Sequence, residues 1–233
     1  MNILFSGASS FSGMWFARAL ARQGHSVSAV FRGRGERDYS GIRLRRVKML
    51  DGLCRRVFGC VFGGAPFLRL AAEKPGWDVF CHHAAAVGDF RAADYNVASA
   101  LAANTRNLPQ VFDTLQSGGC RMVLLTGSVF ESGEGKGSDG LPAVLPYGLA
   151  KSLTWQSFVF YARQCGMRLG KFVIANPFGP LEEARFTAHL AQEWLAQKSA
   201  LVRTPEYVRD NIHISLLAAE YAGFVCKFAE QKK

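Results

Sequence analysis

The chain has 233 residues, of which 49% are hydrophobic and 20% are charged. This length suits one domain, or one domain with a small appendage, and allows a substantial hydrophobic core. The formal charge of +10 invites a nucleic-acid partner, but the densest basic stretch, residues 32–56, lacks the aromatic-interleaved pattern of a base-stacking surface, so we expect no nucleic-acid binding.

The cysteines and the start of the chain indicate the compartment. The six cysteines form no C-x-x-C pair and no metal-ligand spacing with the five histidines, so we expect reduced thiols and no metal site. The first residues do not read as a signal peptide, and no apolar run reaches the length that spans a membrane. These features predict a cytoplasmic protein with no membrane partner.

Apolar runs of strand length alternate along the chain with longer helical patterns. This alternation predicts an α/β fold with a parallel sheet. The third predicted strand is the weakest, because it carries several charges. In chain order, the predicted strands cover residues 2–5, 25–31, 43–50, 77–84, 120–128 and 169–176.

Helical patterns follow the first, fourth, fifth and sixth predicted strands. The second of them, residues 94–116, should be bent or interrupted near Pro109, because proline lacks the backbone N–H that a helix interior needs. A glycine-rich patch, residues 131–140, predicts a loop beside the site that the fifth strand serves. The predicted helices cover residues 12–23, 94–116, 146–165, 184–197 and 212–229.

The segment "SGASSFSG" resembles a phosphate-binding glycine loop in which the middle glycine has become Ser10. Gly7 and Gly13 hold the outer positions, where glycine permits a tight turn and close approach of the backbone to a diphosphate. The Ser10 hydroxyl can donate to a phosphate oxygen. Turns of this composition also occur in proteins that bind nothing, but the position between a strand and an amphipathic helix favours nucleotide binding.

The end of the second predicted strand bears on the choice of dinucleotide. The segment "FRGR" has no carboxylate to accept from the ribose hydroxyls, as an NAD-preferring protein would. Arg32 and Arg34 instead suit a 2′-phosphate, so NADP is favoured over NAD, although NAD stays possible. The alternative is a solvated basic loop. Asp51, placed after the third predicted strand, is a candidate for the adenine amino group or a simple turn residue.

Tyr147 and Lys151 lie four residues apart at the start of a predicted helix, which puts both side chains on one face. A lysine ammonium beside a phenol lowers the tyrosine pKa, so that the phenol can exchange a proton with a substrate oxygen. Alone, such a pair is more often a helix surface. It gains weight because it follows "LLTGS", a strand that ends in the hydroxyls of Thr126 and Ser128.

Seven segments together resemble the extended short-chain dehydrogenase/reductase superfamily, in its branch of nucleotide-sugar epimerases, dehydratases and reductases. They occur in that family's order and cover residues 2–215. The segments are "SGASSFSG", "DVFCHHAA" for H-x-A-A, Asn104 in the following helix, "LLTGSVFE", "YGLAK" for Y-x-x-x-K, "NPFGP" and "VRDNIHIS".

The resemblance implies a Rossmann-type doubly wound sheet and assigns roles to single residues. Tyr147 would be the acid/base, Lys151 would lower its pKa and contact the nicotinamide ribose, and Thr126 would orient the substrate oxygen, with Ser128 beside it. Cofactor binding is expected at Gly7, Ser9, Ser10, Phe11, Gly13, Arg32, Arg34, Asp51, His82, Ala84, Ala85, Asn104, Tyr147, Lys151, Asn176 and Phe178, and substrate binding at Thr126, Ser128, Asn176 and Arg209.

The roles of two histidines and the length of the chain need separate interpretation. His82 would line the cofactor edge or support the sheet, and His213 is interpreted as structural. Family members continue further past "RDNIHIS", so we expect residues 1–175 to bind the dinucleotide and residues 176–233 to form an abbreviated substrate-binding portion. Phe130 stands where the family has tyrosine.

The sequence therefore predicts an NAD(P)-dependent oxidoreductase or epimerase that acts on a nucleotide-linked sugar, with reduction slightly favoured because a short substrate portion confines an intermediate poorly. A non-catalytic NADP-binding sensor or scaffold of the same fold is the alternative. The family also implies a homodimer through the long helices that follow the fourth and fifth strands.

Overall fold

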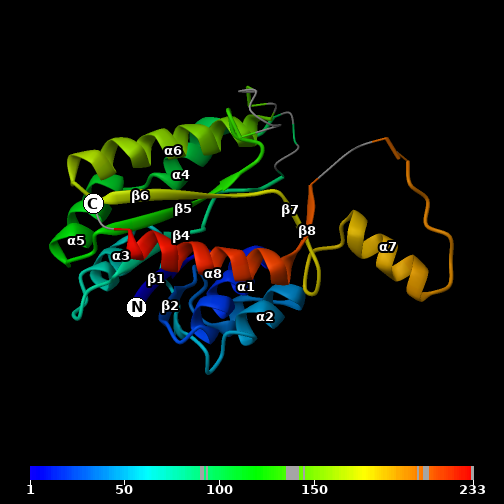
Figure 1. Ribbon diagram of the computed structural model, residues 1–233, viewed down its shortest axis with the longest axis horizontal. Coiled ribbons are helices and arrows are strands. Elements are labelled where there is room, and N and C mark those ends of the chain that lie inside the picture. The colour runs from blue at the N-terminus through cyan, green and yellow to red at the C-terminus, as the bar shows by residue number, and fades with distance from the viewer. Residues whose placement is uncertain are drawn as a thin grey trace.

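The computed structural model describes residues 1–89, 92, 94–134, 142–143, 145–203, 205–206 and 210–231. Its centre is a six-stranded sheet in which every neighbouring pair is parallel (Figure 1). The strand order, β3-β2-β1-β4-β5-β6, reverses direction at β1, as in a doubly wound Rossmann fold. The strands are β1 (Asn2–Ser6), β2 (Ser26–Val30), β3 (Arg55–Val57), β4 (Val79–His82), β5 (Met122–Ser128) and β6 (Arg168–Ile174).

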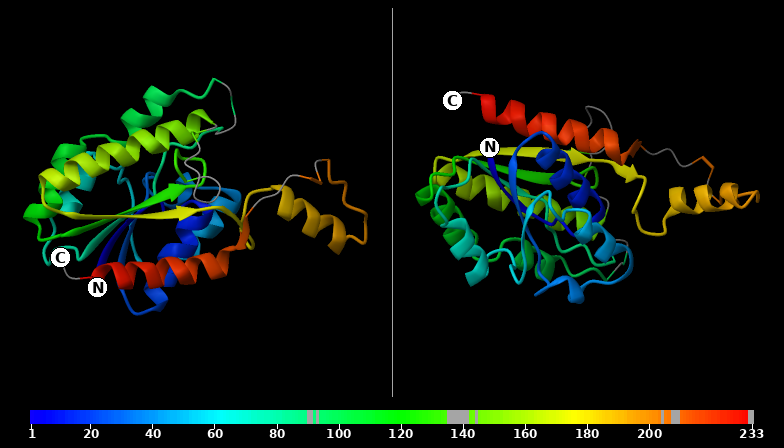
Figure 2. Two further views of the ribbon diagram at one scale, coloured as in Figure 1. Left: turned by 45° about the horizontal axis from the view of Figure 1, so that its top comes forward. Right: turned by 90° about the horizontal axis from the view of Figure 1, so that it is seen from below.

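Helices cover both faces of this sheet, as the two views of Figure 2 show. One face carries α1 and α8, whose apolar residues form a single buried cluster with the strands. The other face carries α3, α5 and α6 over a second cluster. The helices are α1 (Phe11–Arg22), α2 (Gly41–Lys48), α3 (Ala65–Ala71), α4 (Val97–Asn104), α5 (Leu108–Ser117), α6 (Pro146–Gln164), α7 (Phe186–Leu195) and α8 (Ile214–Glu230), with a 3-10 turn at Glu36–Asp38.

The hydrophobic pattern of the strands explains this arrangement. In β1, Ile3 and Phe5 point into the cluster under α1 and α8, and Leu4 points into the opposite cluster, so the strand is apolar on both sides. The α/β prediction is confirmed. Five of the six predicted strands correspond to β1, β2, β4, β5 and β6.

The prediction of a third strand at residues 43–50 is wrong. That segment lies in and just after α2, and the third strand, β3, is the shorter stretch Arg55–Val57. Arg46, Val47 and Leu50 are buried, a spacing that places them on one helical face. The predicted interruption of residues 94–116 is confirmed: α4 ends at Asn104 and α5 begins at Leu108 with Pro109 in its first turn.

An arm leaves the body after β6. It begins with β7 (Asn176–Phe178), continues through α7 and returns at β8 (Asn211–His213), which pairs with β7 in parallel. Figure 1 shows α7 standing apart from the sheet and its covering helices. After the arm, α8 packs on α1, so the end of the predicted second portion returns to the body that contains the six-stranded sheet. The domain division at residue 175 stays a prediction.

Among the described residues, no helix combines the length and the hydropathy needed to cross a lipid bilayer.

Candidate functional site

The glycine loop joins β1 to α1 at the carboxyl edge of the sheet. Gly7 has a φ of +87°, and a Cβ there would stand 2.6 Å from the backbone nitrogen of Ala84. A Cβ on Gly13 would stand 2.2 Å from the carbonyl oxygen of Gly7. Only glycine fits either position. The loop is therefore packed tightly against the backbone that follows β4, which includes Ala84 and Ala85.

Ser10 closes the loop on itself. Its hydroxyl donates to the Gly7 carbonyl oxygen at 2.8 Å and accepts from the Gly13 N–H at 3.1 Å, which makes Ser10 the N-cap of α1. In this structure the hydroxyl donates to the Gly7 carbonyl oxygen, and donation from Ser10 to a phosphate oxygen stays a prediction. Ser10, at the position of the middle glycine, thus stabilises the turn through side-chain hydrogen bonds.

The start of α1 fits the diphosphate of a dinucleotide. The N–H groups of Phe11 and Ser12 lie in the first turn, where no carbonyl of the same helix can accept from them. Such N–H groups, together with the positive end of the helix dipole, attract phosphate oxygens. Ser9, the residue before the cap, also lines the neighbouring pocket.

A pocket of about 540 Å³ opens where the adenosine end of a dinucleotide would lie, next to the end of β2. Arg32 lines it as predicted. Arg34 is not among its lining residues, and the Arg34 backbone N–H donates to the Asp38 carboxylate at 2.6 Å. Arg43 also lines the pocket, although the sequence pattern placed this residue in a strand and gave no signal of a cofactor contact. The lining residues are Ser9, Arg32, Gly33, Asp38, Tyr39, Ser40 and Arg43.

Asp51 does not lie where it was expected. It follows α2 and precedes β3, whereas the prediction placed it after the third strand at the carboxyl edge. Its exposed carboxylate accepts from Arg56 at 2.5 Å. The assignment of Asp51 to the adenine amino group rested on the misplaced strand, and the structure contradicts that placement.

His82 belongs to the packing of the sheet. Its ring is 1% exposed and lies among aromatic rings, 4.2 Å from that of Phe62 and 5.2 Å from that of Phe158. Its Nδ1 is 2.8 Å from the Ser6 hydroxyl. Burial, with a smaller contribution from Lys151, lowers the pKa of His82 to about 3, so the ring is neutral. Of its two expected roles, support of the sheet is the one seen.

The next residue, His83, points to the other face and connects two parts of the site. Its Nε2 is 3.0 Å from the Ser12 hydroxyl at the start of α1, and its Nδ1 is 3.0 Å from the hydroxyl of Thr126 on β5. The rings of Phe5 and Phe16 hold the imidazole from two sides. Because burial lowers its pKa to about 3, His83 is neutral and can both donate and accept.

Asn104 connects the segment after β4 to α6 by two side-chain hydrogen bonds. Its side-chain oxygen accepts from the Ala86 N–H at 2.8 Å, and its amide donates to the Thr154 hydroxyl on α6 at 3.2 Å. The side chain is 4% exposed. Asn104 therefore fixes the segment after β4 to α6, which indicates a supporting position.

Thr126 and Ser128 occupy the end of β5. The Thr126 hydroxyl is 3% exposed and is bonded to His83, with the Tyr221 phenol close by. The Ser128 hydroxyl accepts from the Phe130 N–H at 3.3 Å. The two residues share a strand face as expected, but the Thr126 hydroxyl turns toward α1 and α8, away from α6.

Lys151 reaches the same strand from α6. Its Nζ donates to the carbonyl oxygen of Thr126 at 2.5 Å, and the residue is 4% exposed. Burial lowers the pKa of Lys151 to about 8, an effect that Lys171 strengthens and Glu131 opposes. The side chain therefore remains mostly charged at neutral pH.

Tyr147 lies one helical turn before Lys151, with its ring edge-on to that of Tyr95, 6.2 Å between centroids. Burial raises the pKa of the Tyr147 phenol above its usual value, and Glu131 and Tyr95 raise it further. The expected lowering by Lys151 is not seen in this structure, because the ammonium is directed at the Thr126 carbonyl. The phenol is thus protonated at neutral pH.

Asn176 and Phe178 lie at the base of the arm. Asn176 begins β7, and its backbone N–H donates to the Asp210 carbonyl oxygen at 3.1 Å. The ring of Phe178 is edge-on to that of His213, which caps α8 as a structural residue. Arg209 lies outside the described residues.

The solved structures with a similar fold include two UDP-sugar epimerases. A variant of UDP-glucuronic acid 4-epimerase from Bacillus cereus, in complex with UDP-4-deoxy-4-fluoro-glucuronic acid and NAD, has a TM-score of 0.77 at 18% identity, over 100% of this chain and 74% of that chain. UDP-glucose 4-epimerase from Thermotoga maritima, with UDP-glucose, has a TM-score of 0.68 at 19% identity, over 94% and 71%.

A third structure, the enzyme WbmG of Bordetella bronchiseptica in complex with NAD, has a TM-score of 0.70 at 18% identity, over 100% of this chain and 69% of that chain. At such identities the likeness concerns the fold. A comparison with curated proteins finds no match.

A comparison of the sequence with protein-family models identifies the family. A model of the NAD-dependent epimerase/dehydratase family matches residues 3–221. Because this match runs from β1 to the middle of α8, the chain belongs to the NAD-dependent epimerase/dehydratase family.

Proposed function

We propose that the protein is an NAD(P)-dependent oxidoreductase or epimerase that acts on a nucleotide-linked sugar. Family membership supports this proposal, and the structural neighbours in complex with NAD and UDP-sugars support the class of substrate. The observation that carries it is the position of Lys151, whose buried ammonium is fixed to the end of β5 one helical turn from Tyr147.

Tyr147 is the acid/base in this proposal. A bound nicotinamide supplies or accepts the hydride at a sugar carbon. In reduction, the phenol gives its proton to the carbonyl oxygen, and in oxidation it takes the proton back. Because the pKa of Tyr147 is raised, the phenol is protonated at neutral pH and suits proton donation. Reduction of a keto-sugar uses this donation directly.

A hydroxyl at the end of β5 orients the substrate oxygen. Thr126 is the residue that the family pattern assigns, and Lys151 already touches its carbonyl group. Ser128 is the neighbouring candidate, since it lies nearer the carboxyl edge. Asn176 and Arg209 complete the proposed contacts with the substrate.

NADP is the proposed coenzyme. Arg32 and Arg43 line one pocket with Ser9, and two guanidinium groups can bind a 2′-phosphate with charge-assisted hydrogen bonds. The neighbouring structures contain NAD, which supports a nicotinamide dinucleotide but not the 2′-phosphate.

The experiment compares Tyr147→Phe with the wild type in NADPH consumption over a panel of nucleotide keto-sugars. We expect the variant to lose roughly 100-fold to 10,000-fold of the rate, the usual share of a general acid. Tyr161→Phe, on the same helix but packed against Phe112, is the control and should keep wild-type activity. Equal rates for Tyr147→Phe and the wild type would remove the catalytic assignment.

One observation favours the alternative of a non-catalytic NADP-binding scaffold. The Thr126 hydroxyl is buried and bonded to His83, so it is not presented to a substrate in this structure. Under the alternative, the protein binds NADPH with ordinary affinity, yet no member of the panel is reduced or epimerised.

A further inference from the structure

The end of β5 extends beyond its neighbour β4, and two side chains occupy the edge that this exposes. The last paired residues are His82 and Leu125. Beyond them, the Thr126 carbonyl accepts from the Lys151 ammonium at 2.5 Å, and the Ser128 N–H donates to a Glu131 carboxylate oxygen at 2.8 Å. A lysine and a glutamate thus bind successive backbone groups of one strand edge.

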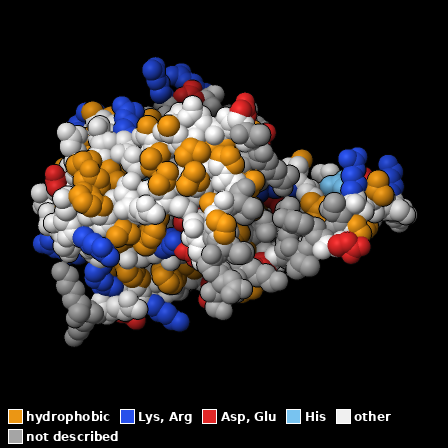
Figure 3. All heavy atoms as spheres, turned by 90° about the horizontal axis from the view of Figure 1, so that it is seen from above, with side chains coloured by type: hydrophobic (Ala, Val, Ile, Leu, Met, Phe, Trp, Pro, Cys, Tyr) orange, Lys and Arg blue, Asp and Glu red, His pale blue; other side chains and the backbone are white. Residues whose placement is uncertain are grey.

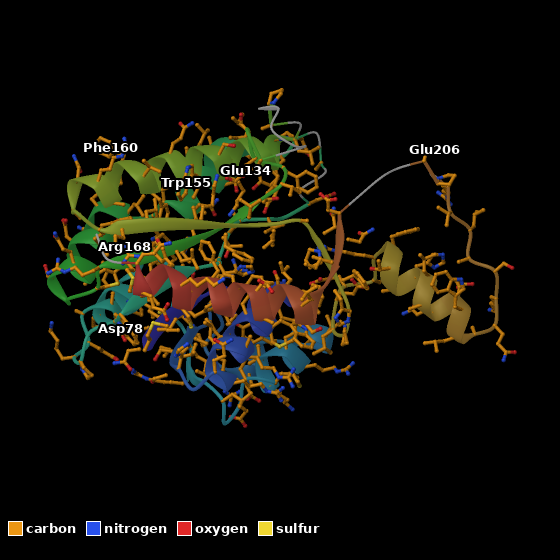
Figure 4. The ribbon with its side chains drawn as sticks, in the orientation of Figure 1. Asp78, Glu134, Trp155, Phe160, Arg168 and Glu206 are labelled. Atoms are coloured by element: carbon orange, nitrogen blue, oxygen red, sulfur yellow. The ribbon has the colours of Figure 1, made fainter. Side chains whose placement is uncertain are left out.

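Glu131 is a buried charge. Its side chain is 2% exposed, and its second oxygen lies 3.4 Å from the Lys171 ammonium on β6. Lys171 also pairs with Glu134 and lies over the Trp155 ring, 4.7 Å from the centroid. Figure 4 labels Glu134 and Trp155, both on the α6 side of β6. Two acids and two lysines therefore meet beneath the helix that bears Tyr147.

We propose that Glu131 is a positioning residue, a buried counter-charge that holds Lys151 as an ammonium against the end of β5, beside Tyr147. The proposal rests on the proposed function. An ammonium taken out of water is stabilised poorly by one neutral carbonyl, because a single hydrogen bond does not replace the lost hydration of the charge. A carboxylate fixed two residues along the same strand edge offsets part of that penalty.

The charges around the pair support this assignment. The groups that act on Lys151 are Glu131, which raises its pKa, and Lys171, which lowers it, while the neighbouring His82 and His83 are neutral. The groups that act on Tyr147 are Glu131 and Tyr95, which raise its pKa, and Arg185, which lowers it. Glu131 acts on both side chains in the same direction.

The test measures the titration of Lys151 directly. The protein is labelled with ¹³C at the lysine Cε, and the Lys151 signal is assigned by its loss in Lys151→Met. In the wild type this signal should titrate near pH 8. In Glu131→Gln, whose amide oxygen can still accept from Ser128, the pKa should fall by about one unit, at the lower end of the effect of a close opposite charge.

Two further variants sharpen the result. Lys171→Met should move the Lys151 pKa upward, because a like charge is removed. Glu134→Gln is the matched control: it also removes an acid that pairs with Lys171, but its side chain is 25% exposed, and the Lys151 pKa should stay within a few tenths of a unit of the wild-type value. Thermal melting confirms that each variant is folded.

A Lys151 pKa unchanged in Glu131→Gln would overturn the proposal. If that variant does not fold, Glu131→Asp takes its place, with the charge one methylene further away, and a lowered Lys151 pKa is again required. The alkaline limb of kcat/KM for reduction should move to lower pH with the same variant. If the Lys151 pKa falls in Glu131→Gln but the wild type turns over no nucleotide sugar, the role of Glu131 stands and the proposed function is wrong.

Discussion

At the scale of single residues, Arg32 and Arg43 determine the choice of coenzyme in our proposal. They line one pocket from the end of β2 and from α2, whereas Arg34 is not among its lining residues. Arg43→Ala should weaken NADPH binding by about 10-fold to 100-fold, since a hydrogen bond to a charged group contributes about 1.5–3 kcal/mol. NADH binding should not change.

Fluorescence titration of the two coenzymes measures this difference, with Arg34→Ala as the control that keeps the NADPH affinity. If Arg43→Ala weakens NADPH and NADH equally, the pocket does not recognise a 2′-phosphate.

Gly13 gives a second prediction at this scale. Its Cβ position is 2.2 Å from the Gly7 carbonyl oxygen, so Gly13→Ala must push the loop and the start of α1 apart. We expect loss of coenzyme binding together with a lower melting temperature. Gly223→Ala on α8 is the control, because a Cβ there meets no atom within 4 Å, and it should leave binding intact. Normal coenzyme affinity in Gly13→Ala would show that the loop does not bind the diphosphate.

The sequence alone could place Tyr147 and Lys151 one turn apart on a helix, because that spacing is a local pattern. It could not identify what each side chain contacts. Glu131 lies in a glycine-rich patch that predicts a loop, yet its carboxylate is buried, since it folds back on Ser128 and meets Lys171 from another strand. Contacts of this kind depend on strand order, which a local pattern does not contain.

At the scale of elements, Arg46 ties α2 to the base of the arm. Its guanidinium is fully buried, donates twice to the Leu181 carbonyl and pairs with Glu183 at 2.6 Å. Leu181 has a φ of +70°, a conformation that leucine seldom adopts, so these bonds hold the turn in place.

Arg46→Met should therefore lower the free energy of unfolding by about 2 kcal/mol, because it leaves the Leu181 carbonyl without its donors. For a chain of this size, that change lowers Tm by roughly 4–8 °C. Thermal melting measures it, and Arg45→Met, at the exposed neighbouring position of α2, should melt as the wild type does. Equal melting of both variants would mean that the tie does not stabilise the fold.

The same helix shows where element prediction fails. Residues 43–50 mix basic and apolar side chains, and such a short run fits a strand or a helix equally well. The true third strand has three residues, Arg55–Val57, too few to form a pattern. Longer elements, such as α6 with 19 residues and β5 with 7, were placed correctly because their patterns extend over more residues.

At the scale of the whole molecule, the predicted homodimer can be tested on the outer face of α6. Leu149 and Phe160 are 46% and 55% exposed there, and Figure 3 shows hydrophobic side chains gathered on the face seen from above. Exposed apolar groups of this kind mark contact surfaces. Phe160→Glu should convert a dimer to monomers in sedimentation velocity.

Leu195→Glu on α7, where the side chain is 86% exposed but belongs to the arm, should leave the dimer intact. A wild-type protein that sediments as a monomer at every concentration would make the dimer prediction wrong.

The pairing of β7 with β8 has a consequence for how this protein can change over time. The arm that contains α7 begins at β7 and ends at β8. Because these two strands pair with each other, the ends of the arm are held together independently of the residues between them. Residues inside such an arm can be exchanged, lengthened or shortened at little entropic expense to the rest. Under the proposed function, in which this arm contacts the substrate, its residues could diverge toward another sugar while the six-stranded sheet and its glycine loop keep their geometry.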